Sequence, residues 1–281
     1  MGSTQITVGD YEISVVDDHI GFKRNPADVF VDVSSEEWDP HRHYALTSDG
    51  HWEAQWRGHL IRRVDGAGGN VLVDTGAGPG PYEHGPPQGD LLTNLTALGI
   101  EPSGVDNVVT THCHWDHIGW NLQTDGDSET TTFPNAMYHV AENDWEFYGD
   151  PANANDEFNA YVAPLDATGQ LKLVLGEHEL MEGVTLLPTN GHTPGHQCIL
   201  VQSGGETAVL TGDLFHNVAQ IREQHWCPVF DWRQDLSTAS RRWLLWRALA
   251  ENWTVVSGHL PTGMSMGKVV EQDGNPTWVA V

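Results

Sequence analysis

The sequence is short of basic residues. Lysine and arginine together number 13, against 39 aspartates and glutamates, so the formal net charge is −26 at pH 7. A surface this negative repels nucleic-acid phosphates and anionic lipid headgroups, which argues against nucleic acid or a membrane surface as a partner. Solubility and adaptation to high salt are the two explanations of this charge.

The chain also has few cysteines and no long apolar run. No stretch approaches the ~18 consecutive apolar residues of a membrane span, and the first residues carry neither a basic leader nor an apolar segment. Three cysteines at irregular spacing argue against a disulfide framework in a chain of 281 residues. We therefore expect a cytoplasmic protein with reduced thiols.

Histidine, in contrast, is abundant. The 16 histidines outnumber the lysines and arginines together, and with the many carboxylates they indicate a divalent metal as the first cofactor to consider. The chain is long enough to bury a sizeable core. At roughly 150 residues per domain, its length predicts one or two domains.

The hydrophobic pattern predicts strands in both halves of the chain, with helices between them. Alternating apolar and polar residues indicate half-buried strands in 5–16 and 56–64. Further strands are expected at 70–74, 105–110, 136–140, 254–257, 267–270 and 277–281, with hairpin-like pairs at 171–187 and 197–210. The simplest interpretation is one α/β (α+β) domain, residues 1–281, with two packed sheets.

Helices and loops are expected in three further regions. Residues 76–89 are rich in glycine and proline and predict a loop, after which Asp90 is expected to cap a helix that ends near Gly99. Residues 142–170 predict helices and loops. The clearest helix is 235–253, and its apolar face is expected to hold Leu236, Trp243, Leu244, Trp246 and Leu249.

The densest cluster of chemistry-bearing residues follows the strand predicted at 105–110. His112, His114, Asp116 and His117 spell HxHxDH. Residues two apart in an extended segment point the same way, so His112 and His114 can bind one ion. The turn that follows can direct Asp116 and His117 toward a neighbouring position. The spacing therefore favours two adjacent cations.

Other candidate ligands follow other predicted strands. GHTPGH spans 191–196, TGD spans 211–213 and SGH spans 257–259. Strand ends let a rigid sheet present His192, Asp213 and His259 at one rim.

These motifs resemble, in order and in sequence, the metallo-β-lactamase-fold superfamily of metallohydrolases. The resemblance extends from about Val71 to Pro261 and includes VLVDTG, THCHWDH, GHTPGH, TGD and SGH. It implies an αββα sandwich of two mixed β-sheets with helices on the outer faces, preceded by an extended N-terminal segment of about 70 residues.

The resemblance also implies a dinuclear centre. His112, His114 and His192 would hold the first metal; Asp116, His117 and His259 would hold the second; and Asp213 would bridge them. Zinc is the first choice of metal, with manganese, iron or cobalt as alternatives. His196 and Asp74 match positions that support the ligands. Two such cations share a hydroxide that attacks the substrate.

Hydrolysis is the reaction class that this set of ligands implies. An aspartate at the bridging position, Asp213, is unlike typical β-lactamases, and the full set resembles the branch of N-acyl-homoserine lactone lactonases and methyl parathion hydrolase-like enzymes. Those lactonases have a tyrosine where this chain has His216, which can still donate a hydrogen bond. We expect opening of a lactone or cleavage of a carboxylic ester, with Asp116, Asp213 and His216 as catalytic residues.

Three alternatives stay open beside this hypothesis. The first is a phosphotriester hydrolase, the second is a metal-dependent oxygenase, and the third is a metal-binding protein that has lost catalysis. The substrate is expected to be a small neutral molecule, partly apolar or aromatic, and exposed aromatic residues would allow a homodimer. The residues expected to line the substrate pocket are Trp115, Trp120, Phe215, His216, His225, Trp226 and Phe230.

Two further expectations concern residues near these motifs. Cys113 lies between two ligands and should point away from the metals as a small buried residue. His41 and His43 lie in a polar segment and are expected at the surface, unless the N-terminal segment folds over the site.

Overall fold

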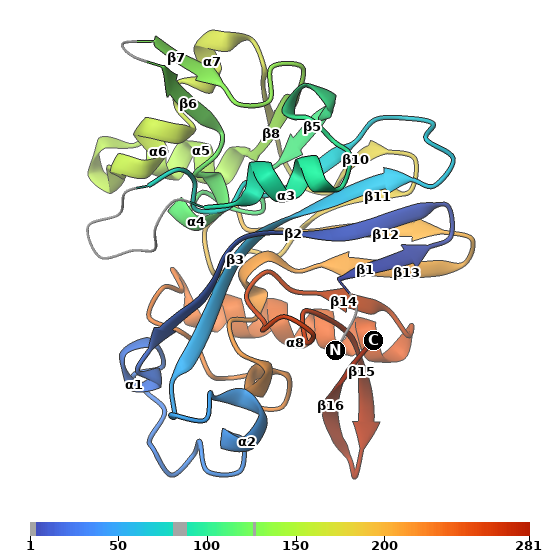
Figure 1. Ribbon diagram of the computed structural model, residues 1–281. Helices are drawn as coiled ribbons and strands as arrows, with labels where there is room; N and C mark the ends of the chain where they lie inside the picture. Colours follow the sequence, from blue (N-terminus) through green and yellow to red (C-terminus); the bar gives the residue numbers. More distant parts are fainter. Residues whose placement is uncertain (1–3, 81–88, 126–127) are drawn as a thin grey trace. The chain divides into compact units, whose positions relative to one another are not determined.

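A computed structural model describes residues 4–80, 89–125 and 128–281, and its strands form two large mixed sheets and a small hairpin (Figure 1). The first sheet has the strand order β1-β2-β3-β4-β5-β8-β9. Its strands are β1 (Gln5–Val8), β2 (Tyr11–Arg24), β3 (Trp52–Arg63), β4 (Val71–Val73), β5 (Asn107–Val109), β8 (Met137–Ala141) and β9 (Leu171–Val174). The hairpin is formed by β6 (Leu122–Asp125) and β7 (Ser128–Thr131).

The second sheet has the strand order β10-β11-β12-β13-β14-β15-β16. Its strands are β10 (His178–Met181), β11 (Val184–Pro188), β12 (Gln197–Ser203), β13 (Glu206–Leu210), β14 (Thr254–Val256), β15 (Met266–Gln272) and β16 (Asn275–Ala280). Both sheets combine parallel and antiparallel pairs: β4, β5, β8 and β9 run parallel, and so do β13 and β14.

The helices are mostly short. The α-helices are α1 (Pro26–Val29), α2 (Arg42–Ala45), α3 (Leu91–Ala97), α4 (Trp115–Ile118), α5 (Glu142–Gly149), α6 (Asp156–Tyr161), α7 (Leu165–Thr168) and α8 (Gln234–Ala250). The 3₁₀ helices are η1 (Pro102–Gly104), η2 (Pro151–Asn153), η3 (Gly212–Leu214) and η4 (Val218–Ile221).

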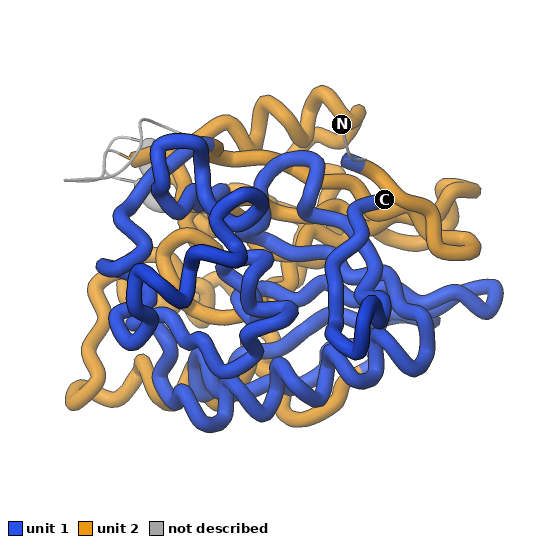
Figure 2. The backbone as a smooth tube through the Cα atoms, turned by 90° about the horizontal axis from the view of Figure 1, so that it is seen from below, with its two compact units in different colours: residues 1–4, 21–55, 179–281 blue, residues 5–20, 56–178 orange. Residues whose placement is uncertain are grey.

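Contacts between Cα atoms group the chain into two compact units (Figure 2). Unit 1 includes Gly21–Gln55 and Glu179–Val281, and unit 2 comprises Gln5–Ile20 and Trp56–His178. The assignment of residues 1–281 to one domain remains a prediction. Among the described residues, no helix is both long enough and apolar enough to cross a membrane.

Unit 2 is built around one apolar core. Side chains from the sheet, such as Leu72, Val108 and Val140, pack with Leu91 of α3 and Phe158 of α6, and all five are at most 2% exposed. Burying such side chains is worth roughly 1.5–3 kcal/mol each. The core therefore fixes the carboxyl ends of β4 and β5, where the candidate ligands of this unit begin.

Most of the elements expected from the sequence are confirmed, including the hairpin of β12 and β13 and the helices within 142–170. The region 171–187 is different, because β9 belongs to the first sheet while β10 and β11 belong to the second. Asp90 precedes α3, but its side chain makes no capping hydrogen bond. Residues 81–88 of the expected loop lie outside the described residues.

The predicted apolar face of α8 is largely wrong. Its buried residues are Ser237, Arg241, Leu244, Leu245 and Ala248, which repeat at helical spacing and include an arginine. The predicted Leu236, Trp243, Trp246 and Leu249 are exposed, and Trp246 is the most exposed of them at 65%. The prediction placed the largest apolar side chains of α8 in the core. The buried face instead includes Arg241, whose guanidinium donates to backbone carbonyls.

A close backbone contact fixes the loop after β4 against α4. The N–H of Thr75 donates to the His117 carbonyl at 2.8 Å, and the N–H of Gly119 donates to the Gly76 carbonyl at 2.8 Å. A Cβ atom at Gly119 would overlap the backbone of Ala77. Glycine is therefore required at 119 by the approach of the two backbones.

We expect Gly119→Ala to lower the free energy of unfolding by about 1–3 kcal/mol, because the added methyl group forces the loop away from α4. Gly104→Ala is the matched control, since its Cβ would meet only Ile100 at an ordinary 3.6 Å. Urea unfolding of both variants measures the difference. Equal stability of the two variants would show that the contact is not constrained.

Candidate metal centre

The HxHxDH segment of unit 2 begins directly after β5. His112 and His114 lie in the extended connection to α4, whose first turn carries Asp116 and His117. The Nε2 atom of His112 lies 3.1 Å from Nδ1 of His114, and the rings of His112 and His117 are 4.1 Å apart. Nε2 of His117 lies 3.7 Å from an oxygen of Asp116. The four side chains therefore form one cluster of donor atoms.

Asp74 orients this cluster from the end of β4. Its carboxylate accepts hydrogen bonds from the N–H and hydroxyl of Thr111 at 2.7 and 2.8 Å, and it pairs with Nδ1 of His117 at 2.8 Å. A carboxylate accepts, so Nδ1 of His117 carries the proton and Nε2 keeps a lone pair for a cation. Asp74 has a positive φ of 60°, which is uncommon for a residue other than glycine. The supporting role expected for Asp74 agrees with these contacts.

Cys113 points into the core, as expected. Its side chain is fully buried, and its N–H donates to the Asp144 carboxylate at 3.0 Å. Burial and the nearby carboxylates of Asp144 and Asp74 raise the pKa of its thiol well above the usual value. The thiol therefore stays protonated and serves as packing. All three cysteines of the chain are free.

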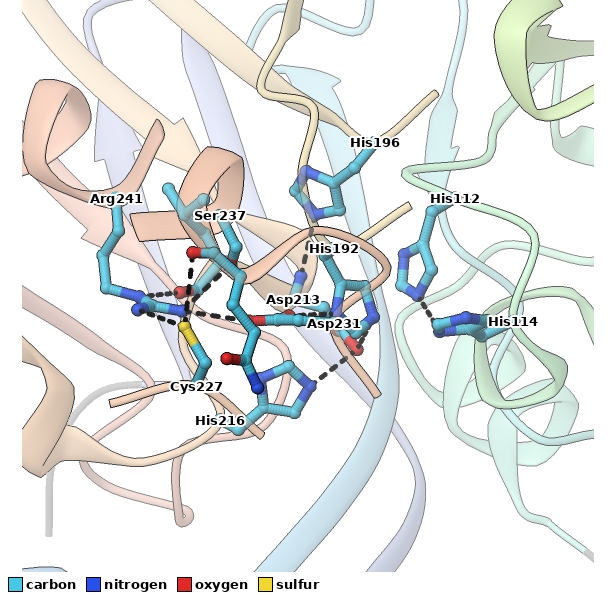
Figure 3. A network of polar contacts seen from close by, with 12 residues as sticks. His112, His114, His192, His196, Asp213, His216, Cys227, Asp231, Ser237 and Arg241 are labelled. Carbon is cyan, nitrogen blue, oxygen red and sulfur yellow. Dashed lines mark hydrogen bonds and ion pairs between the residues drawn. The ribbon is translucent and has the colours of Figure 1, made fainter. Parts of the chain in front are cut away.

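The donor set of unit 1 is centred on Asp213, in η3 just after β13 (Figure 3). Oδ2 of Asp213 lies 3.1 Å from Nε2 of His192 and 3.1 Å from Nε2 of His216. Its other oxygen, Oδ1, lies 2.9 Å from Nε2 of His259. Each oxygen of the carboxylate thus faces a different predicted ligand.

The Nδ1 atoms of two of these imidazoles already donate hydrogen bonds to other groups. Nδ1 of His259 donates to the backbone carbonyl of Gln55 at 2.8 Å, and Nδ1 of His192 donates to the Asp231 carboxylate at 2.8 Å. In the neutral form, each Nε2 then presents a lone pair to the Asp213 carboxylate. Two acceptors this close require a proton or a cation nearby, so the donor set fits a metal.

Asp231 is a functional residue that the sequence analysis missed. Burial disfavours its charged form, but the hydrogen bond from His192 and the charge of Arg241 outweigh this and lower its pKa to about 2. Burial likewise lowers the pKa of His192, yet Asp213 and Asp231 together raise it to about 9. The site therefore stabilises positive charge beside Asp213, as a metal centre must.

Arg241 of α8 was missed as well. Its fully buried guanidinium donates to the carbonyls of Leu214, Gln224 and Trp226 at 2.8 to 3.0 Å and lies 3.8 Å from Asp231. It thereby ties the chain after Asp213 to the segment that holds Asp231 (Figure 3). The signal that could have found Arg241 is its helical spacing from the buried Leu244 and Leu245.

The loop that carries His192 is fixed by backbone contacts. The N–H of Trp232 donates to the His192 carbonyl at 2.9 Å, and the N–H of Arg233 donates to the Gly191 carbonyl at 2.8 Å. Gly191 has φ of 140° and lies against the backbone of Ser237, where a Cβ would not fit. His196 from the same loop accepts a hydrogen bond from the N–H of Asp213 at 3.1 Å, which agrees with the supporting role expected for it.

His216 is placed beside the Asp213 carboxylate and away from water. Burial lowers its pKa to about 4, even though Asp213 acts in the opposite direction. The indole N–H of Trp52 donates to its backbone carbonyl at 2.7 Å and fixes the loop. Donor atoms of Asp213, His216 and His259 lie within 4.8 Å of one another, so His216 is also a candidate ligand.

The other residues expected to line the pocket are spread over several environments. Trp120, Phe215 and Trp226 pack in the interior: the Trp120 indole donates to Asp18 at 2.8 Å, and the Trp226 ring lies 4.6 Å from Trp38. All three are buried within their own units, and their place in the substrate pocket remains a prediction. His225 is exposed.

Two of these aromatic residues lie near site residues of their own unit. Phe230 is partly buried, with its ring 5.8 Å from that of His216. Trp115 is partly buried against Trp56, at 5.0 Å between ring centroids.

His41 corrects a further expectation. It is 3% exposed and pairs with Tyr44 and Glu223, whereas its neighbour His43 is exposed as predicted. The polar sequence around His41 gave no sign of this burial, because its partner Glu223 lies far along the chain.

Comparison with solved structures shows the fold. A structure described as hydrolase AbOPH in the beta lactamase superfamily is 25% identical, with a TM-score of 0.82 over 100% of this chain and 97% of that one. AidC, a dizinc quorum-quenching lactonase in complex with a product, is 20% identical, with a TM-score of 0.83 over the same shares. The fold class predicted from the sequence is therefore confirmed.

Sequence comparison gives the family. A curated N-acyl homoserine lactonase from Bacillus sp is 28% identical over 160 residues, which are 50% of this chain and 57% of that protein. The chain thus spans about half the length of the curated relatives it matches. The family described as the metallo-beta-lactamase superfamily matches residues 59–259, well over half of the chain. The protein belongs to the metallo-β-lactamase superfamily.

Proposed function

We propose that this protein is a dinuclear metal-dependent hydrolase that opens a small lactone or cleaves a carboxylic ester. The observation that carries the proposal is the Asp213 carboxylate, whose two oxygens face different histidines, His192 and His259. A carboxylate that bridges two cations must direct one oxygen to the ligands of each cation. The match to the family and the lactonases among its relatives support the same conclusion.

The proposed ligands keep the assignment made from the sequence. His112, His114 and His192 would hold the first metal, Asp116, His117 and His259 would hold the second, and Asp213 would bridge them. We propose zinc, because neutral imidazoles and carboxylates suit it and because AidC is described as a dizinc enzyme. Two bound divalent cations would lower the pKa of a shared water and polarise the substrate oxygen.

The chain's own residues have three tasks in this chemistry. Asp231 and the Gln55 carbonyl hold the imidazoles of His192 and His259 with their Nε2 atoms toward Asp213. Asp116 is placed by the first turn of α4, and we propose that it takes up the proton released by the attacking water and passes it to the leaving oxygen. His216 is neutral above its lowered pKa of about 4, so its ring carries one N–H, which donates to Asp213 in this structure. We propose that the same N–H turns to the substrate oxygen once Asp213 binds the metals.

The experiment that tests this function is a hydrolysis panel with metal analysis. We expect purified protein to hold about two divalent ions per chain and to hydrolyse acyl lactones or aryl esters faster than phosphotriesters. Asp213→Asn should lower metal affinity at least about 100-fold and abolish turnover, because the amide carries no charge to balance two cations. Full activity of Asp213→Asn, or activity without metal, would refute the proposal.

His216 can be distinguished as a substrate contact or a ligand. We expect His216→Ala to keep its metal and to lose roughly 10–100-fold in kcat, since one hydrogen bond to the reacting group is lost. Metal analysis and steady-state kinetics measure the two effects separately. The control is His225→Ala, which changes an exposed histidine of the same region. Loss of metal from His216→Ala would instead make His216 a ligand.

The role of Asp231 can be tested in the same way. We expect Asp231→Asn to weaken metal binding about 10–100-fold, because the amide holds the His192 imidazole less firmly and does not raise its basicity. Asp235→Asn is the matched control, as Asp235 is an exposed carboxylate at the start of α8. Competition with a metal chelator gives the affinities, and equal affinities of the two variants would exclude Asp231 from the centre.

A further inference from the structure

A buried carboxylate of β2, outside the proposed set of ligands, accepts four hydrogen bonds. This residue, Asp18, is 3% exposed. Its Oδ2 accepts from the N–H groups of Ala77 at 2.6 Å and Gly78 at 3.2 Å. Its Oδ1 accepts from the N–H of Leu91 at 3.0 Å and from the indole N–H of Trp120 at 2.8 Å. Each oxygen thus receives two donors, as the lone pairs of an ionised carboxylate allow.

The four donors come from three separate segments of unit 2. Two belong to the loop after β4, one is at the first residue of α3, and the fourth follows α4. A Cβ atom at Gly76 or at Gly89 would overlap the carboxylate of Asp18, so close packing around this group requires glycine at both positions. The chain is therefore built tightly around Asp18.

The loop after β4 also supports α4. The N–H of Thr75 donates to the His117 carbonyl and the N–H of Gly119 donates to the Gly76 carbonyl, both at 2.8 Å. Asp74, at the start of the loop, pairs with Nδ1 of His117 at 2.8 Å. The backbone and the imidazole of His117 are thus both held by the loop that Asp18 anchors.

The contacts of Asp18 fit a carboxylate and no other group of the same shape. Burial raises the pKa of Asp18, and the four hydrogen bonds oppose this effect. Since every partner is a donor, an amide in this place would turn its NH₂ group toward two N–H groups, whichever way it is oriented. Such an unmatched donor is costly in the interior.

We propose that Asp18 is a positioning residue that sets where α4 presents Asp116 and His117. This inference rests on the proposed function, which assigns these two residues to the second metal. His112 and His114 lie before α4, in the extended connection from β5. Their position depends on β5, so loss of the Asp18 carboxylate should weaken the second cation more than the first.

Asp18→Asn tests the proposal, because it keeps the shape of the side chain and removes its charge. Competition with a chelator, on the full chain loaded with zinc, measures the affinity of each ion. We expect the affinity for the second ion to fall about 10–100-fold and that for the first to change less than about threefold. His117→Ala and His114→Ala identify the two ions, because each removes a proposed ligand of a different cation.

Two further variants separate positioning from a general loss of stability. Trp120→Phe keeps a ring but removes the donor that links Asp18 to the end of α4, so it should weaken the second ion about threefold to tenfold. Glu12→Gln is the matched control, since Glu12 is on the same strand and accepts from Nε of Arg62 at 2.7 Å. It removes a charged partner away from the loop and should leave both affinities unchanged.

Hydrogen exchange in the metal-free protein tests the positioning without any cation. Asp18→Asn and Trp120→Phe should speed exchange of the Thr75 and Gly119 amides at least about tenfold, because these amides join the loop to α4. Glu12→Gln should not.

The two measurements distinguish failure of this inference from failure of the proposed function. Unchanged exchange in Asp18→Asn, or equal weakening of both cations, overturns the role of Asp18 even where the enzyme hydrolyses esters. Faster exchange of the two amides in a protein that binds fewer than two divalent ions refutes the dinuclear centre and supports the positioning of α4 by Asp18.

Discussion

The constraint on which the centre depends is the charge of the Asp213 carboxylate, buried among three imidazoles. A carboxylate removed from water is costly unless positive charge lies beside it. In their neutral forms the imidazoles of His192 and His259 cannot donate to Asp213 from Nε2, because their single protons lie on Nδ1 and are held by Asp231 and the Gln55 carbonyl. Either protons or cations must therefore balance Asp213. The Nδ1 protons of these two imidazoles leave their Nε2 lone pairs directed at Asp213, where we propose that the cations bind.

The candidate ligands are recognisable in the sequence because each one follows a strand in a short motif. HxHxDH after β5 and the single ligands after β11, β13 and β14 are local features, and a strand ends where its apolar run ends. Asp231 and Arg241 could not be found in this way. Asp231 stands in an irregular segment, and Arg241 stands on a helix whose many tryptophans drew attention to the wrong face. Their roles depend on long-range contacts that no local pattern encodes.

The same distinction applies to the aromatic residues near the motifs. Position close to a ligand in sequence says little about whether a ring turns toward a cavity or toward the core. Phe215 is adjacent to His216 and yet is completely buried, because neighbouring residues of an irregular segment can face opposite ways. Tyr44 and Trp278 line a cavity of about 530 Å³ in unit 1, but each is remote in sequence from the motifs. Residues that line a cavity are therefore less predictable than candidate ligands, since chemistry restricts a ligand to a few residue types while shape alone selects a cavity wall.

One rigidly held segment of unit 1 carries candidate residues of the centre and also lines a cavity. The segment from Asp213 to Asn217 carries His216 and the carboxylate that we propose as the bridge, and its backbone is held by Trp52 at His216 and by Arg241 at Leu214. The next residues form η4, whose capping box at Asn217 also contacts Ala45 beside Tyr44. One short stretch of chain thus positions the donors and the cavity wall together. Because a catalytic group must stay within about 0.5 Å of its productive position, such shared support is a physical reason for building both on the same segment.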